Sequence, residues 1–356
     1  MDTNDSDSYF IVWLSIVWLY MYCNPALRLP YINKPKPIVC ILTKFCTWFC
    51  CQIFGIHTEG FSKQINYLID KSVSCGKGAN AVISMLHHYL ENFGLGEHLE
   101  LTADNCAGQN KNAYVMWYLC WRMANHLHQT ASISFMLAGH TKFAPDWCFG
   151  LFKRQYRRTF VSSLHDIEQV VNASSLSSIN KSAFVGNENG DVHIPTYDWI
   201  NFLKPHFKKV TGIKSNHHFM FSAGRPGIVT MKLFCDSPTT EQQLTVTPCP
   251  LQMPPVLVTK GLENKRKKYL FNEIRQFCRD ETKDIVCPKP EPPLQPTTDD
   301  VPADELSAET TILKLLKNQQ NHKQSGTEPA IYWQWQWLWA SGSKTCKEFV
   351  SRTATC

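Results

Sequence analysis

Two short polar segments carry the residues of this chain that could do chemistry. In the first, Thr102–Asn112 (TADNCAGQNKN), a carboxylate follows a strand-like alternation and a glycine turn leads into a helix. At the carboxyl end of a strand in an open α/β sheet, Asp104 would face the crevice where ligands bind. The alternative is that Asp104 and Asn105 only cap the helix that follows. The polar neighbours of Asp104 are candidate nucleic-acid contacts: Asn105, Gln109, Asn110 and Lys111.

The second segment, Gly139–Lys153, places His140 in a turn and Asp146 near the start of the next helix. A right-handed crossover between adjacent strands would bring this turn to the same edge of the sheet as Asp104. Asp104 and Asp146 are therefore candidate Mg²⁺ ligands and, with His140, candidate catalytic residues, because phosphodiester cleavage uses carboxylates around paired Mg²⁺ ions. The alternative is that Asp146 interacts with the helix macrodipole and that His140 is a turn residue.

Two basic runs could meet phosphates. Lys260–Arg279 contains seven basic and two acidic residues, with apolar residues on one helical side. The other run follows Asp146 in the same predicted helix, and its cations are expected either to contact phosphates or to form a solvated face. These cations are Lys153, Arg154, Arg157 and Arg158.

The elements around these segments predict an α/β protein. Strand patterns at 51–57 and 64–69 lead into an amphipathic helix at 79–93, and then a strand, a helix, a strand and a helix alternate up to residue 158. Helices of this length between strands imply layers of helix on sheet. A hairpin before such an alternation fits the ribonuclease H-like fold if one more strand precedes residue 50. Beyond residue 160 we expect a helix at 161–171, a strand at 191–194, a helix at 199–207 and a hairpin at 217–234.

Composition limits the class of protein. The chain has 356 residues, 44% of them hydrophobic, and 36 Lys and Arg against 30 Asp and Glu, which gives a net charge of +6. This composition excludes wholesale disorder, and the charge alone is too weak to imply nucleic acid. The 15 cysteines include no C-x-x-C pair, so we expect reduced thiols in an intracellular protein. No small-molecule substrate is evident, and the oligomeric state is open.

The N-terminal segment, residues 1–36, contains an apolar run at Tyr9–Cys23. This run has three interpretations: a buried strand or helix, a membrane anchor, or sequence foreign to the fold. Because 15 residues are short for a bilayer span, a membrane is not the expected partner. The Cys-rich stretch after it contains a set of four possible metal ligands, but their spacing matches no common zinc site. Burial in a strand is therefore the preferred interpretation of these residues. That set is Cys46, Cys50, Cys51 and His57.

The motifs DNCAGQNKN and GHTKFAPDWCFG resemble an uncharacterised domain-of-unknown-function family of transposon-derived animal proteins. The resemblance implies a ribonuclease H-like mixed sheet flanked by helices, as in DDE/D transposases and integrases, with three acids that hold Mg²⁺ for DNA strand cleavage and transfer. On it, Asp104 is similar to the second acid and Asp146 is a candidate for the third. The domains expected are a ribonuclease H-like domain at 37–235, a Pro- and Thr-rich linker at 236–259, a basic helix at 260–285 and a tail of low order at 286–356.

The first acid of that pattern is missing. It should lie on the first strand, but no Asp or Glu occurs between Asp7 and Glu59, and a rough alignment places the position near Tyr22. Asp70 could substitute, although a turn cap is the more common role for such a residue. We therefore expect a degenerate, inactive nuclease, with a non-catalytic nucleic-acid- or chromatin-binding module and a membrane-anchored protein as the alternatives. DNA is the expected partner, Mg²⁺ the cofactor of any active form, and the nucleus the expected location.

Overall fold

A computed structural model describes residues 9–15, 51–93, 96–137 and 144–290 of the chain. All of them belong to one compact unit, which spans residues 1–291. Several sequence-based predictions lie outside the described residues: the turn at His140, the first-acid position near Tyr22, the ligands Cys46 and Cys50, and most of the tail at 286–356.

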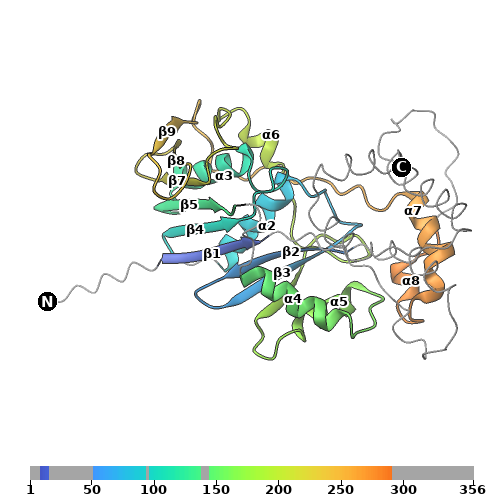
Figure 1. Cartoon of the computed structure of the whole chain (residues 1–356). Helices are drawn as coiled ribbons and strands as arrows, with labels where there is room; N and C mark the ends of the chain where they lie inside the picture. The colour runs from blue at the N-terminus through green and yellow to red at the C-terminus, as the bar shows by residue number, and fades with distance from the viewer. Residues whose placement is uncertain (1–8, 16–50, 94–95, 138–143, 291–356) are drawn as a thin grey trace, which may run out of the picture. The chain divides into compact units, whose positions relative to one another are not determined.

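The core of this unit is a mixed β-sheet (Figure 1). Its strands are β1 (Tyr9–Ser15), β2 (Cys51–Thr58), β3 (Lys63–Asp70), β4 (His98–Ala103), β5 (Thr130–Phe135), β6 (Asn180–Phe184), β7 (His218–Ser222), β8 (Ile228–Lys232) and β9 (Thr240–Gln243). Among the described residues they form one sheet in the order β6-β3-β2-β1-β4-β5-β7-β8-β9. β1, β4 and β5 run parallel to one another, β2 is antiparallel to β1 and β3, and β7, β8 and β9 continue the sheet as antiparallel strands.

Helices cover both faces of the sheet, as Figure 1 shows. α2 (Ala79–Asn92), α3 (Ala113–Ala124) and α6 (Trp199–Leu203) bury their apolar sides with β2–β5 and β7–β8 in one cluster. α4 (Ala144–Tyr156) and α5 (Leu164–Asn172) pack on the opposite face, where a second cluster involves β2 and β3. The predicted class, an α/β protein with a mixed sheet flanked by helices, is confirmed.

The first part of the N-terminal apolar run, for which the sequence left three interpretations, forms strand β1. Tyr9–Ser15 pairs with β2 on one side and with β4 on the other, so it is the further strand that the fold required before residue 50. The strand interpretation of this apolar stretch therefore holds for residues 9–15. No helix in the described part of the chain is long and apolar enough to cross a membrane.

Regular patterns before residue 160 give the predicted elements, whereas two later predictions are wrong. The strand expected at 191–194 is only an isolated bridge between Gly186 and Val192, and the real strand in this region is β6, whose sequence NKSAF has little apolar character. β6 is an edge strand that pairs with β3 alone, and its alternation of apolar and polar residues is correspondingly weak. Residues 236–259, predicted as a Pro- and Thr-rich linker, contribute β9 at the other edge of the sheet.

The C-terminal basic run is not one continuous α-helix. It begins as α7 (Asn264–Tyr269), continues through a π-helical turn at Leu270–Ile274 and a 3₁₀ turn at Arg275–Phe277, and ends with α8 (Lys283–Val286). Leu270 and Ile274 are buried in the α4–α5 cluster. We refer to residues 264–286 as the basic hairpin.

Candidate functional site

Asp104 closes a tight turn at the carboxyl end of β4. Its Oδ1 accepts hydrogen bonds from the Cys106 backbone N–H (3.2 Å) and from Asn110 Nδ2 (2.7 Å). Burial raises the pKa of the Asp104 carboxyl above its ordinary value, although these two hydrogen bonds act in the opposite direction. A proton therefore competes with a cation for this group more strongly than at an exposed aspartate.

The cap of α3 is Asn112 rather than Asp104 or Asn105. The Asn112 side chain accepts hydrogen bonds from the backbone N–H groups of Tyr114 (3.0 Å) and Val115 (3.2 Å), which are orphan donors of the first helical turn. The capping alternative for Asp104 is thus wrong, because another residue of the same motif takes that role.

Two of the predicted nucleic-acid contacts lie inside the protein. Asn110 is fully buried against Asp104, and Lys111 is 5% exposed. The Lys111 ammonium group donates to the Lys214 carbonyl oxygen (3.2 Å) and lies over the Phe135 ring. Asn105 is exposed and Gln109 is half-buried, so of the four predicted contacts these two present side chains to a partner.

The structure does not assemble a metal site from the described residues. Asp146 is exposed in the first turn of α4, and His140 lies outside the described ranges. Nowhere in residues 9–15, 51–93, 96–137 and 144–290 do three or more His, Cys, Asp or Glu side chains form a group that could hold a metal ion. Because Mg²⁺ requires near-octahedral oxygen ligation, these donors do not fit a two-metal site.

Asp70 does not replace the missing acid. Its Oδ1 accepts hydrogen bonds from the Ser72 backbone N–H (2.7 Å) and hydroxyl (2.6 Å), so it closes the turn after β3. Burial raises the pKa of the Asp70 carboxyl. Asp70 closes this turn but does not cap α2, whose N-cap is Gly78.

The two described members of the Cys-rich ligand set, Cys51 and His57, do not form a metal site together. Cys46 and Cys50 lie outside the described residues. Cys51 and His57 lie six residues apart on the same strand, about 20 Å from each other at 3.3 Å per residue, which is too far to share an ion. His57 is buried, and its Nδ1 lies 3.6 Å from the Cys148 Sγ of α4.

α4 presents a basic face to solvent. Its buried side chains, among them Cys148, Phe149 and Phe152, face the sheet, and Phe149 packs so closely that a Cβ at Gly55 would meet its ring at 2.6 Å. The four predicted cations at the C-terminal end of α4 are all exposed, and none takes part in an ion pair with another described residue. They are Lys153, Arg154, Arg157 and Arg158.

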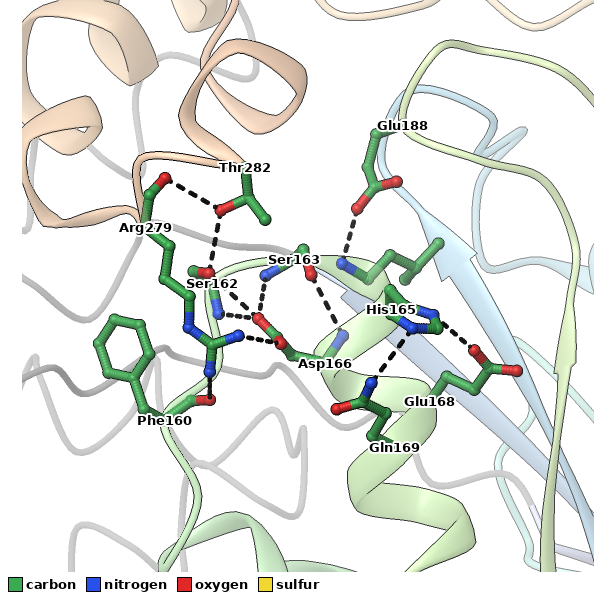
Figure 2. A network of polar contacts seen from close by, with 11 residues as sticks. Phe160, Ser162, Ser163, His165, Asp166, Glu168, Gln169, Glu188, Arg279 and Thr282 are labelled. Carbon is green, nitrogen blue, oxygen red and sulfur yellow. Dashed lines mark hydrogen bonds and ion pairs between the residues drawn. The ribbon is translucent and has the colours of Figure 1, made fainter.

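A polar network attaches the basic hairpin to the start of α5 (Figure 2). Arg279 forms an ion pair with Asp166 (2.8 Å) and donates to the Phe160 carbonyl oxygen (3.2 Å). Asp166 is buried and also accepts from the backbone N–H groups of Ser162 and Ser163, while Thr282 bonds the Ser162 hydroxyl. Ser163 and Asp166 form a capping box, so the motif S-x-x-D was the available sequence signal for this anchor.

Two sets of cations that lie more than 100 positions apart in sequence belong to elements of one apolar cluster. Phe149 and Phe152 of α4 share this cluster with Leu270 and Ile274 of the basic hairpin. The basic residues of α7 are exposed or half-buried, as the α4 cations are exposed. We define the basic interface as these two sets: Lys153, Arg154, Arg157 and Arg158 with Lys265, Arg266, Lys267 and Lys268.

The Arg279 ion pair should control how firmly the basic hairpin is attached. In Arg279→Gln, the loss of an ion pair with a buried partner is expected to weaken the attachment by about 1 kcal/mol, which corresponds to about fivefold more frequent local opening. Hydrogen exchange of residues 264–286 measures this opening. Arg225→Gln, which removes the exposed ion pair with Glu241 at the β8–β9 edge, is the matched control. Equal protection of the hairpin in both variants would contradict the role of Arg279.

The fold and these contacts define a mixed α/β protein with two basic sets on elements that share one apolar cluster. Residues 47–237 match the family described as domain of unknown function DUF7869, and the chain belongs to this family. No curated protein and no solved structure matches the chain significantly.

Proposed function

We propose that this chain is a transposon-derived protein with a ribonuclease H-like core, which binds DNA through the basic interface and has lost Mg²⁺-dependent strand cleavage. The order β3-β2-β1-β4-β5, with β2 antiparallel and β1, β4 and β5 parallel, supports the assignment of the core, because this is the arrangement of ribonuclease H-like sheets. Since one fold hosts many functions, the function itself rests on the site.

The observation that carries the binding function is that two basic sets are exposed or half-buried on elements that share one apolar cluster. Phosphates are the polyanion that a cationic surface binds with release of counterions. Lysine and arginine contacts to phosphates fix position without reading sequence, so DNA of any sequence is the expected ligand. With DNA as the ligand, the nucleus is the location that we propose.

Loss of cleavage follows from the carboxylates. The sequence of β1, YFIVWLS, has no acid, and the register that pairs Trp13 with Thr102 leaves no acid on β1 beside the Asp104 turn. Asp104 alone, with a pKa that burial raises and with its Oδ1 bonded within its own turn, is a poor ligand for Mg²⁺. The cleavage function therefore lacks the first of its three acids.

Binding and cleavage are tested in one pair of experiments. Wild-type protein should bind a random duplex with a plot of log K against log salt whose slope is about −4 or steeper, because at least four to five phosphates are contacted. It should not nick a supercoiled plasmid in Mg²⁺ or Mn²⁺ above the level of Asp104→Asn. A flat salt response would overturn the binding function, and nicking that depends on Asp104 would overturn the loss of cleavage.

A further inference from the structure

A cysteine, a histidine and a serine form a hydrogen-bonded chain on the sheet, away from the basic interface. Cys235 is exposed in the turn after β8, and its Sγ lies 3.4 Å from His218 Nε2 on β7. The other ring nitrogen, His218 Nδ1, lies 2.9 Å from the Ser134 hydroxyl on β5. A thiol, a base and a group that orients the base are the parts of an activated nucleophile.

The sheet holds these groups in register. Ser134 is the direct cross-strand partner of His218, and His218 is the direct partner of Lys232 on β8, so the three side chains share one face. Their neighbours on this face are polar or half-buried, which leaves the histidine reachable from solvent. The position of the imidazole is thus set by backbone pairing rather than by a mobile loop.

The turn that carries Cys235 is fixed as well. The Phe234 N–H donates to the Ser237 hydroxyl (3.1 Å), and the Ser237 N–H donates to the Phe234 carbonyl oxygen (3.0 Å). The Lys232 ammonium group donates to the Cys235 carbonyl oxygen (3.2 Å). These three bonds keep the thiol beside the imidazole, because they restrain the backbone on both sides of it.

We propose that Cys235 is a reactive thiol that exchanges with small disulfides, with His218 as its base and Ser134 as the residue that positions His218. Cys235 Sγ attacks one sulfur of the disulfide, the old S–S bond breaks, and a new S–S bond joins Cys235 to half of the reagent. The thiol proton passes to His218 Nε2 and then to the departing thiolate, so a mixed disulfide and one free thiol result. Cys235 is oxidised and the leaving sulfur is reduced.

Charged and polar groups surround the histidine. They are Lys232 on β8, Cys235, the Ser134 hydroxyl and His217, the residue before His218, and Asp236 follows Cys235 in the turn. Burial, with electrostatic contributions from His217 and Lys232, lowers the pKa of His218, which favours the unprotonated ring that a base must start from. When Nε2 accepts the thiol proton, Nδ1 carries its own proton and donates a hydrogen bond to the Ser134 hydroxyl.

The test uses the full-length chain and glutathione disulfide as the probe, with site-resolved mass spectrometry of each cysteine over time. Cys235 should be modified about tenfold faster than half-buried Cys106, and His218→Asn should lower the Cys235 rate about tenfold while the Cys106 rate stays the same. His206→Asn, a partly buried histidine near α6, is the control for loss of an imidazole. If His218→Asn leaves the Cys235 rate unchanged, exposure alone explains the reactivity and the proposal is overturned.

Ser134→Ala separates a positioning role from a purely structural one. Loss of the acceptor for Nδ1–H makes the imidazole a weaker base, so the acid limb of the Cys235 rate–pH profile should move to lower pH. A structural role would change the stability of the protein but not this limb. An unchanged profile in a folded Ser134→Ala variant would remove Ser134 from the proposal.

Discussion

Replacing Lys153, Arg154, Arg157 and Arg158 with glutamine should lower the affinity for duplex DNA about 100- to 1000-fold at about 150 mM salt. Four lost phosphate contacts would also make the salt slope shallower by about 3 to 4. These side chains are exposed and have no ion-pair partner among the described residues, so their removal leaves no buried charge behind. Fluorescence anisotropy of a labelled duplex across a salt series measures both quantities.

The control for this variant must change the net charge equally. Four exposed lysines follow α6, on the layer that packs against the other apolar cluster: Lys204, Lys208, Lys209 and Lys214. Their replacement with glutamine removes the same charge and should change the affinity less than about threefold. Equal losses in both variants would show that DNA responds only to the overall charge, and the basic interface would then be abandoned. Circular dichroism confirms that both variants are folded.

Most of the core could be predicted from sequence because its signals are local. In α2 the buried residues Val82, Met85, Leu86 and Tyr89 recur at helical spacing, and in β4 Leu99 and Leu101 alternate with polar residues. Each pattern spans one element and does not depend on a distant partner. The predicted strand before residue 50 also followed from topology, although its residues could not be placed by pattern alone.

The candidate site was harder to predict because accessibility depends on distant residues. Lys111 looks like a surface cation in the motif, but the Lys214 carbonyl oxygen and the Phe135 ring enclose it. The anchor of the basic hairpin joins Arg279 to Asp166, which are 113 positions apart. Neither contact has a periodic signature, so the sequence indicates the residue types but not their burial.

The stability of the protein should fall steeply between about pH 6.5 and pH 4, because two buried histidines must become charged. Burial, with a further contribution from the Arg122 guanidinium, lowers the pKa of His87 and of His128 to about 4. Arg122 Nε donates to His128 Nδ1 (3.1 Å), and its Nη1 bonds Glu91 and Tyr118. A protonated His128 could no longer accept the hydrogen bond from Arg122 Nε, and both imidazolium groups would repel the guanidinium.

The direction follows from proton linkage. With a folded pKa below the unfolded value of 6.5, each histidine binds more protons when unfolded, so its stabilising contribution is complete above pH 6.5 and is lost as the pH falls towards 4. Each should contribute roughly 1–3 kcal/mol over this window. Urea unfolding at a series of pH values measures the slope.

The variant His128→Asn isolates this contribution from the carboxylates. Asp70 and Asp104 act in the opposite direction, since burial raises their pKa and their protonation at low pH favours the folded state. Their effect is the same in wild type and variant, so the difference between the two pH profiles belongs to the histidine. His128→Asn should flatten the slope between pH 6.5 and pH 4, whereas His165→Asn, on the exposed side of α5, should leave it intact. Parallel profiles for wild type and His128→Asn would show that burial and Arg122 do not lower the pKa of His128 in the folded protein.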